Sequence, residues 1–128
     1  MKNRYQELLQ IIKKSYAPYS HFKVAAIVET DKGNFSGVNM ENSSYSLSMC
    51  AERNAIGSAI TAGAKQITAI HLLALSKTKN KSAIPCGACR QVMAEFAKND
   101  FPIYVYQSNG AMKEYSFKKL LPFAFTLK

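Results

Sequence analysis

Apolar residues recur first at helical and then at strand intervals along the start of the chain. Residues 2–15 carry apolar side chains at helical spacing, which predicts an amphipathic first helix. Pro18 ends that pattern, because proline restricts its own backbone and that of the residue before it. Residues 22–30, FKVAAIVET, predict a mostly buried strand, and residues 34–40 a second strand. The short turn DKG between them predicts an antiparallel hairpin.

The middle of the chain alternates helical patterns with a strongly apolar strand. Residues 50–62 have helical spacing and precede Gly63, a residue typical of helix ends. Residues 67–75, ITAIHLLAL, form a continuous apolar run, which is typical of a strand in a sheet covered on both faces. A further helix follows, whose inner face is predicted to carry Val92, Met93 and Phe96.

The last part of the chain reads as two strands and a short helix. Residues 101–107, FPIYVYQ, predict a strand, and residues 112–117 another. The turn between them is too short for a crossover, so these two strands must be antiparallel neighbours. Residues 117–125, FKKLLPFAF, predict a short helix and an aromatic end.

These elements contain no linker, repeat or low-complexity segment. A chain of 128 residues, 48% of them hydrophobic, is long enough to bury the core of one ordinary domain. We therefore expect a single α/β domain over residues 1–128, with three α/β/α layers built on a mixed five-stranded sheet. The charged start MKNRYQELLQ lacks a signal peptide, and no apolar run has membrane-spanning length. We expect a cytoplasmic protein without a membrane partner.

The net charge of +9 changes this picture little. Most of the basic residues are lysines scattered along the chain, with the densest cluster, KTKNK, at residues 77–81 in a predicted loop. This dispersal is typical of a solvated surface rather than of a nucleic-acid interface. The arginines are Arg4, Arg53 and Arg90, and the last two lie inside the cysteine motifs.

Three cysteines, Cys50, Cys86 and Cys89, are the strongest chemical signal in the sequence. Their odd number argues against a disulfide framework. Cys50 and Cys86 begin predicted helices, where free N–H groups and the helix dipole stabilise a thiolate, and Cys89 lies one turn after Cys86. Three protein ligands with an open fourth position are typical of catalytic zinc. His21 and His71 are poorly placed to be ligands, because they lie at the start of one strand and inside another.

Two other interpretations of the cysteines remain open from their spacing. A thioredoxin-like redox pair would use Cys86 and Cys89 and would leave Cys50 unexplained. A purely structural zinc site would leave one coordination position open.

Glu52 and Arg53 favour the catalytic interpretation. Glu52 follows Cys50 by two residues on the first helical turn, so its carboxylate can lean toward the open position and move protons there. In isolation such a glutamate would be interpreted as a surface charge that stabilises the helix dipole. Three thiolates around one zinc ion leave an excess negative charge, which Arg53 can offset by hydrogen bonding to the sulfurs.

Five segments together resemble one enzyme family. They are YAPYSHFKVAA (16–26), NMENSSYS (39–46), CAER (50–53), PCGACRQ (85–91) and LLPFAF (120–125). The cysteine and glutamate motifs resemble those of the zinc-dependent nucleobase deaminases. All five, in this order and spacing, resemble the small homotetrameric cytidine deaminases over nearly the whole chain.

The resemblance implies a reaction and a cofactor. Cys50, Cys86 and Cys89 would hold one zinc ion per subunit, with Glu52 as the catalytic proton shuttle and Arg53 beside the sulfurs. Free cytidine and 2'-deoxycytidine would be deaminated by water to uridine and 2'-deoxyuridine plus ammonia, as a step of pyrimidine salvage. Glu52 would protonate N3 of the base and later assist the departure of ammonia.

The resemblance also implies how the substrate binds. Asn39 and Glu41 match a pair that hydrogen-bonds a ribose hydroxyl, Phe22 an aromatic against the base, and Ala51 a pocket wall. Tyr45 and Phe125 are expected to contribute to sites shared between subunits of a homotetramer. Taken alone, Phe22 and Phe125 would be interpreted as core residues. Asn39 and Glu41 would be interpreted as the end of a strand, although their two-residue spacing puts both side chains on one side of it.

Two departures and three alternatives qualify this expectation. Ala25 stands where many relatives carry glycine, and Phe123 replaces a smaller residue, which leaves substrate preference more open than reaction type.

A nucleic-acid editing deaminase has only the net charge in its favour, and we expect no nucleic-acid partner. A blasticidin-type aminonucleoside deaminase shares the zinc motif. A zinc-stabilised interaction domain would bind metal without turnover.

Overall fold

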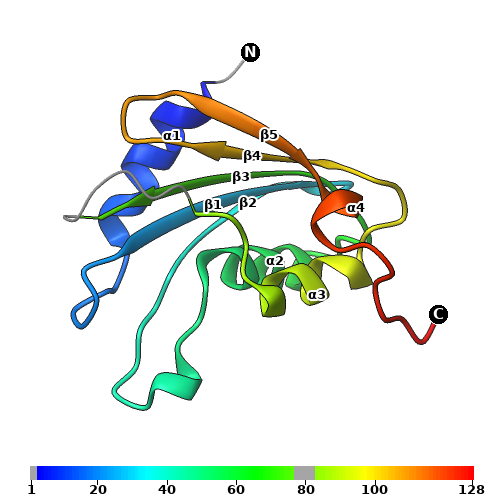
Figure 1. Cartoon of the computed structure of the whole chain (residues 1–128), viewed down its shortest axis with the longest axis horizontal. Coiled ribbons are helices and arrows are strands. Elements are labelled where there is room, and N and C mark those ends of the chain that lie inside the picture. The colour runs from blue at the N-terminus through cyan, green and yellow to red at the C-terminus, as the bar shows by residue number, and fades with distance from the viewer. Residues whose placement is uncertain (1–2, 77–82) are drawn as a thin grey trace.

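The computed structural model describes residues 3–76 and 83–128, and the predicted loop at residues 77–81 lies outside this part of the chain. Five strands form one sheet in the order β2-β1-β3-β4-β5 (Figure 1). The strands are β1 (Lys23–Thr30), β2 (Gly33–Val38), β3 (Ile67–Leu75), β4 (Pro102–Tyr106) and β5 (Met112–Ser116). The α-helices are α1 (Arg4–Ile11), α2 (Ala51–Thr61), α3 (Gly87–Glu95) and α4 (Phe117–Leu120).

Helices cover both faces of this sheet, as predicted. Helix α1 packs on one face, while α2 and α3 lie together on the other (Figure 1). Strand β1 serves both layers because its side chains alternate: Ala25 and Ile27 face α1, whereas Ala26 and Val28 face α2. In the described residues, no helix combines the length and apolar character needed to cross a membrane.

The mixed topology brings the starts of α2 and α3 to the same edge of the sheet. Strands β3 and β4 are parallel neighbours, whereas the other neighbouring pairs are antiparallel. Helix α2 precedes β3 and helix α3 precedes β4. Each helix runs back along the sheet before the chain turns into the strand that follows it. Because β3 and β4 point in the same direction, the N-termini of α2 and α3 meet beyond the carboxyl ends of these two strands.

Two predicted element ends differ from the structure by two residues or more. Helix α1 ends at Ile11 and is followed by a tighter 3₁₀ turn over Ile12–Lys14. Strand β2 ends at Val38 instead of residue 40. The reason is the Asn39 side chain, whose Oδ1 accepts the Val24 N–H at 2.9 Å and so takes a donor that a longer ladder would use.

Glycine at position 37 lets α2 lie directly on β2. A Cβ atom added to Gly37 would stand 2.5 Å from the Ala55 nitrogen and 2.6 Å from the Ala51 oxygen. Only a residue without a side chain permits this approach. The contact sets the position of the first turns of α2, which include Glu52.

Candidate metal centre

The three cysteines converge at the shared edge of α2 and α3. Cys50 is the N-cap residue of α2, and Cys86 is the N-cap residue of α3. The Cys50 and Cys86 sulfurs lie 3.8 Å apart, and the Cys86 and Cys89 sulfurs lie 3.5 Å apart. All three sulfurs lie within 4.8 Å of one another. The predicted convergence of the two helix starts is therefore confirmed.

This geometry fits a zinc ion. Two sulfurs bound to one tetrahedral zinc at bond lengths of about 2.3 Å stand about 3.8 Å apart, close to the spacing found here. The thiols are free of disulfides, and Cys86 Sγ already accepts the backbone N–H of Cys89 at 3.5 Å. His71 lies elsewhere, on β3, where it hydrogen-bonds Glu29 and Tyr106 as a core histidine. Among the residues that the structure describes, the cluster thus offers three sulfur ligands and leaves a fourth position open.

Arg53 supplies positive charge directly to the sulfurs. Its Nη2 donates to Cys50 Sγ at 3.3 Å. A hydrogen bond with Cys89, together with this guanidinium, lowers the pKa of Cys50 to about 5. The same shared hydrogen bond raises the pKa of Cys89, because the proton of the pair stays on that sulfur. The environment therefore favours thiolate at Cys50 even before a metal is considered.

Glu52 is buried beside the cluster rather than exposed on the helix. Its residue is 5% exposed, and this burial raises the pKa of its carboxyl to about 6. The interpretation of Glu52 as a surface charge is therefore wrong. A carboxyl with this pKa exchanges a proton near neutral pH, which is what a general acid or base requires.

A cavity of about 410 Å³ opens in front of Glu52, Cys50 and Cys86. It brings together seven of the predicted site residues: Phe22, Asn39, Glu41, Cys50, Ala51, Glu52 and Cys86. It also contains residues to which the sequence analysis gave no role: Val24, Ser48, Met49, Ala83 and Ile84. Ser48, Met49 and Ile84 could have been suspected from their positions just before the cysteine motifs, whereas Val24 reads as ordinary core.

Asn39 has a structural task in this cavity wall. Its Oδ1 accepts from Val24 N and from the Ser15 hydroxyl, and its Nδ2 donates to the Phe22 carbonyl at 2.8 Å. The side chain therefore fixes the segment that carries Phe22. One Nδ2 hydrogen of the amide is left over, because an asparagine amide carries two.

Glu41 is held as an anion at the same wall. Its Oε1 accepts the backbone N–H groups of Tyr19 and Ser20 at 3.0 and 3.2 Å, and its Oε2 accepts the Ser20 hydroxyl. The hydrogen bond from the Ser20 hydroxyl lowers the pKa of Glu41. Asn39 and Glu41 thus share one cavity wall, but they do so from a loop beyond β2 and not from one side of a strand.

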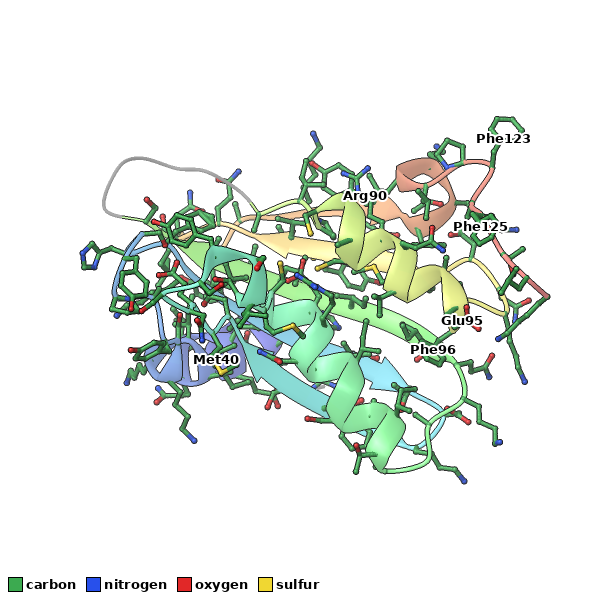
Figure 2. The ribbon with its side chains drawn as sticks, turned by 90° about the horizontal axis from the view of Figure 1, so that it is seen from below. Met40, Arg90, Glu95, Phe96, Phe123 and Phe125 are labelled. Carbon is green, nitrogen blue, oxygen red and sulfur yellow. The ribbon has the colours of Figure 1, made fainter. Side chains whose placement is uncertain are left out.

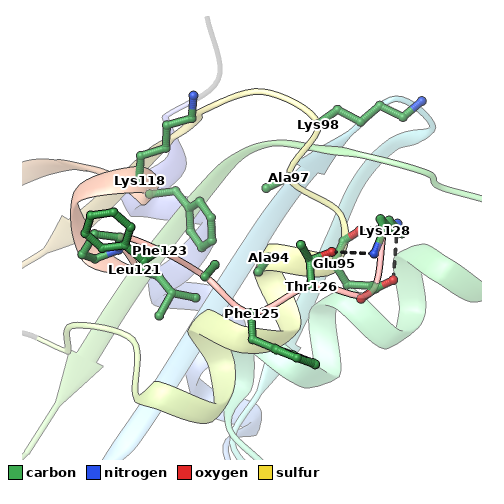
Figure 3. A pocket seen from close by; sticks show the side chains of 13 residues that line it. Ala94, Glu95, Ala97, Lys98, Lys118, Leu121, Phe123, Phe125, Thr126 and Lys128 are labelled. Atoms are coloured by element: carbon green, nitrogen blue, oxygen red, sulfur yellow. Dashed lines mark hydrogen bonds and ion pairs between the residues drawn. The ribbon is translucent and has the colours of Figure 1, made fainter.

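Tyr45 and Phe125 lie outside this cavity. Tyr45 is 77% exposed and lies in a short 3₁₀ helix, η2 (Tyr45–Leu47), on the loop that projects from the body of the molecule in Figure 1. Phe125 is 68% exposed and lines a different cavity of about 600 Å³ between α3 and the chain end (Figure 3). Neither side chain reaches the metal centre of its own chain.

The fold and this centre together define a class of enzyme. An open three-thiol site at two helix N-termini, with a buried carboxyl beside it, is typical of metal-dependent hydrolases that activate water. The cavity in front of it has the size of a small-molecule site.

Comparisons with known proteins give the family. The family model described as "Cytidine and deoxycytidylate deaminase zinc-binding region" matches residues 2–105. The cytidine deaminase of Mycoplasma genitalium is 39% identical over 91% of this chain and 88% of its own length. That of Halalkalibacterium halodurans is 41% identical over 94% of this chain and 90% of its own length.

Solved structures agree with the sequence relatives. The crystal structure of cytidine deaminase from Burkholderia pseudomallei matches with a TM-score of 0.85 and 38% identity, covering 98% of this chain and 100% of that one. Among the sequence relatives, a blasticidin-S deaminase from Bacillus cereus is 28% identical over 80% of this chain and 76% of its own length. The chain therefore belongs to the cytidine and deoxycytidylate deaminase family, whose matched region binds zinc.

Proposed function

We propose that the protein hydrolytically deaminates free cytidine and 2'-deoxycytidine to uridine and 2'-deoxyuridine, releasing ammonia. The observation that carries this proposal is the buried Glu52 beside an open three-thiol centre, in one cavity of about 410 Å³. The relatives named cytidine deaminase support the choice of substrate.

The residues of the centre divide the chemistry between them. Cys50, Cys86 and Cys89 would hold zinc, which when bound supplies Lewis-acid chemistry that makes water a nucleophile at neutral pH. Glu52 accepts one proton from the attacking water and gives it to N3 of the base. It then passes the remaining hydroxyl proton to the C4 amino group, which leaves as ammonia while the C4 carbonyl forms. The Glu52 carboxyl suits both directions of transfer because burial raises its pKa to about 6. Arg53 offsets the charge of the sulfurs through its contact with Cys50.

The opposite wall of the cavity would hold the nucleoside. The free Nδ2 hydrogen of Asn39 and the anionic Glu41 suit a sugar hydroxyl, with Glu41 accepting its hydrogen. The 3'-hydroxyl is the one that cytidine and deoxycytidine share, and it is esterified inside a polymer. Phe22 and the Ala51 backbone would enclose the base. These contacts favour a free nucleoside over a nucleic acid.

We further propose a homotetramer whose subunits share sites. Large apolar side chains stand exposed on the projecting loop and at the chain end: Tyr45, Leu47, Phe123, Phe125 and Leu127. Each of these two segments exposes more than one large apolar side chain, which is typical of a surface that another chain covers. Tyr45 and Phe125 of one subunit would complete the cavity of another. The free thiols suit a reducing compartment, so we place the enzyme in the cytoplasm, in pyrimidine salvage.

The test compares four substrates on one zinc-loaded preparation. We expect the ultraviolet spectrum of cytidine and of deoxycytidine to change to that of the uridine products, with equimolar ammonia. Blasticidin S and single-stranded oligonucleotides should remain unchanged. Turnover of blasticidin S alone would move the protein to the antibiotic branch of the family, and turnover of oligonucleotides alone would make it an editing enzyme. Zinc binding without turnover of any of these substrates would indicate a zinc-stabilised interaction domain instead of an enzyme.

Phe125→Ala tests the shared site. We expect KM for cytidine to rise roughly tenfold with little change in kcat, because aromatic contacts to a base contribute about 1–3 kcal/mol. Steady-state kinetics and the molar mass in solution are measured on the same sample. An intact tetramer with unchanged KM would remove Phe125 from the site.

A further inference from the structure

Helix α3 carries two consecutive polar side chains that the proposed catalytic roles leave unused, Arg90 and Gln91. The Arg90 guanidinium donates from Nε to the Pro85 carbonyl at 2.8 Å and from Nη1 to the Leu120 carbonyl at 2.7 Å. Gln91 Nε2 donates to the Phe125 carbonyl at 3.0 Å. Figure 2 shows Arg90 on the side of α3 that faces α4, with Phe125 farther along near the chain end.

The contact with Pro85 acts on the metal centre. Pro85 is fully buried and directly precedes the ligand Cys86. Its carbonyl belongs to the rigid peptide plane that leads into Cys86, so a donor on that oxygen fixes the direction in which the Cys86 backbone enters α3. Arg90 follows Cys89 on the same helix. One guanidinium therefore holds residues 83–86, which lead directly into α3, at the edge where the sulfurs meet.

The contact with Leu120 acts on the C-terminal tail, which we define as residues 121–128. Leu120 is the last residue of α4, and the carbonyls at the end of so short a helix lack partners within it. Arg90 satisfies this one with a cation, which is favourable at a helix C-terminus. The tail begins at the next residue. Its starting direction is therefore set by the same side chain that holds Pro85.

The remainder of the tail lies along α3. Gln91 holds the Phe125 carbonyl, and Lys128 Nζ binds the Glu95 carbonyl at 2.9 Å and its carboxylate at 3.3 Å. Figure 3 marks contacts of Lys128 near Glu95 with dashed lines. These outer contacts do not involve Pro85, whereas Arg90 hydrogen-bonds both Pro85 and Leu120 and so joins the segment before Cys86 to the start of the tail.

We propose that Arg90 is a positioning residue that couples the metal loop (residues 83–86) to the C-terminal tail. The proposal rests on the proposed function to the extent that the tail serves catalysis by presenting Phe125 to a neighbouring subunit. A change at the metal centre of one subunit then alters the presentation of Phe125 to another. By linkage, order at the start of the tail, where Arg90 binds the Leu120 carbonyl, and affinity for zinc support each other.

The role requires arginine and not merely a positive charge. The guanidinium presents Nε and Nη1 in a rigid plane, and here each nitrogen holds one of two separate carbonyls. A lysine ammonium is a point charge on a flexible stem and cannot reproduce this fork. Arg90→Lys therefore separates charge from geometry, and Arg90→Met removes both while retaining an unbranched side chain of similar length.

The first experiment follows backbone hydrogen exchange in the wild-type protein before and after zinc is removed with a chelator. We expect zinc removal to speed exchange at residues 121–126 at least tenfold. This increase should be larger than any increase in the exchange rate of β3. In Arg90→Met the tail should exchange fast with or without zinc. Wild-type tail exchange that does not respond to zinc would overturn the proposal, whether or not the variants fold.

The second experiment measures zinc release into a chelator and KM for cytidine. We expect Arg90→Met to speed release and raise KM, each roughly tenfold, as the loss of a charged hydrogen bond implies. Arg90→Lys should rescue neither quantity. Gln91→Ala is the matched control: it cuts only the tail contact, so KM rises while zinc release stays at the wild-type rate. Normal zinc release in Arg90→Met would contradict the coupling.

The two proposals fail in different ways. If Phe125→Ala and Gln91→Ala both leave KM unchanged, the tail does not serve a neighbouring site and the shared-site part of the proposed function is wrong. The response of tail exchange to zinc still decides the role of Arg90 in that case. If Phe125→Ala raises KM and Arg90→Met does not, the coupling itself is wrong.

Discussion

Two glutamates line the same cavity, and their surroundings give them opposite proton affinities. Burial raises the pKa of Glu52 to about 6, whereas the hydrogen bond from the Ser20 hydroxyl lowers the pKa of Glu41. Glu52 can therefore carry a proton near neutral pH, while Glu41 remains an acceptor. Two identical side chains thus suit different tasks, proton transfer and sugar binding, because of their environments alone.

Glu52→Gln tests this assignment. We expect the variant to bind zinc as the wild type does and to lose about 10²–10⁴-fold in kcat, the usual contribution of a general acid or base. Kinetics and metal analysis are performed on the same sample. Glu41→Gln, which alters the same cavity, should mainly raise KM. A near-normal kcat in zinc-loaded Glu52→Gln would remove Glu52 from the mechanism.

The chemistry of the site could be predicted from sequence, but its hydrogen-bonded walls could not. Cys50, Cys86 and Glu52 follow from local spacing at helix starts, which sequence shows directly. The internal bonds of Asn39 join it to Ser15 and Val24. These partners are distant in sequence and come together only through the tertiary fold. The residue spacing around Asn39 therefore could not predict them.

At the scale of elements, the position of α2 is set by its contact with β2. Gly37 lies against the backbone of Ala51 and Ala55, within one turn of Glu52. A shift of α2 would therefore move the carboxylate relative to the cysteines of α3. The parallel pair β3 and β4 places the two helix starts together, and Gly37 fixes how closely one of them approaches the sheet.

Gly37→Ala is expected to destabilise the protein by about 1–3 kcal/mol, because the added methyl group overlaps backbone atoms. It should also lower kcat, since Glu52 moves with the helix. Denaturant unfolding and kinetics measure the two effects. Gly57→Ala is the matched control: its methyl group meets nothing within 4 Å, and alanine is the better helix former by about 1 kcal/mol. Equal stability of both variants would contradict the tight contact.

Element boundaries were predictable where burial decides them. The bounds of β3 match the apolar run at residues 67–75, because that strand is covered on both faces. The predicted end of β2 was wrong by two residues because the Asn39 side chain accepts the Val24 N–H that a longer backbone ladder would use. The order of strands required tertiary information, although the antiparallel pairing of β4 with β5 followed from the short turn.

At the scale of the whole molecule, a polar network ties the α1 layer to the sheet. His71 on β3 contacts Glu29 on β1 at 2.6 Å and Tyr106 on β4 at 3.1 Å. Arg4 of α1 reaches the same Glu29 carboxylate at 3.2 Å. The α1 layer lies on the face of the sheet opposite the metal centre. We therefore expect this network to affect the free energy of unfolding and not the catalytic rate.

The network predicts how stability depends on pH. Burial lowers the pKa of His71 below its ordinary 6.5 and outweighs the opposing attraction of Glu29. The unfolded chain therefore binds this proton more readily, so the His71 contribution is complete above pH 6.5 and is lost as pH falls below it. Denaturant unfolding of the wild type and of His71→Gln is compared from about pH 5 to 8, because the raised pKa of Glu52 acts on both proteins alike. The stability advantage of the wild type over His71→Gln should shrink as pH falls. An advantage that grows toward acid would contradict the account.

The most direct test of the whole account is a zinc titration of metal-free protein, with cytidine turnover recorded at each step. Three thiol ligands with one open position predict that turnover rises linearly and stops at about one zinc per chain. Glu52→Gln should take up the same zinc without turnover. Full activity in metal-free protein, or a plateau far from one zinc per chain, would contradict the central claim that this three-thiol centre and Glu52 together deaminate cytidine.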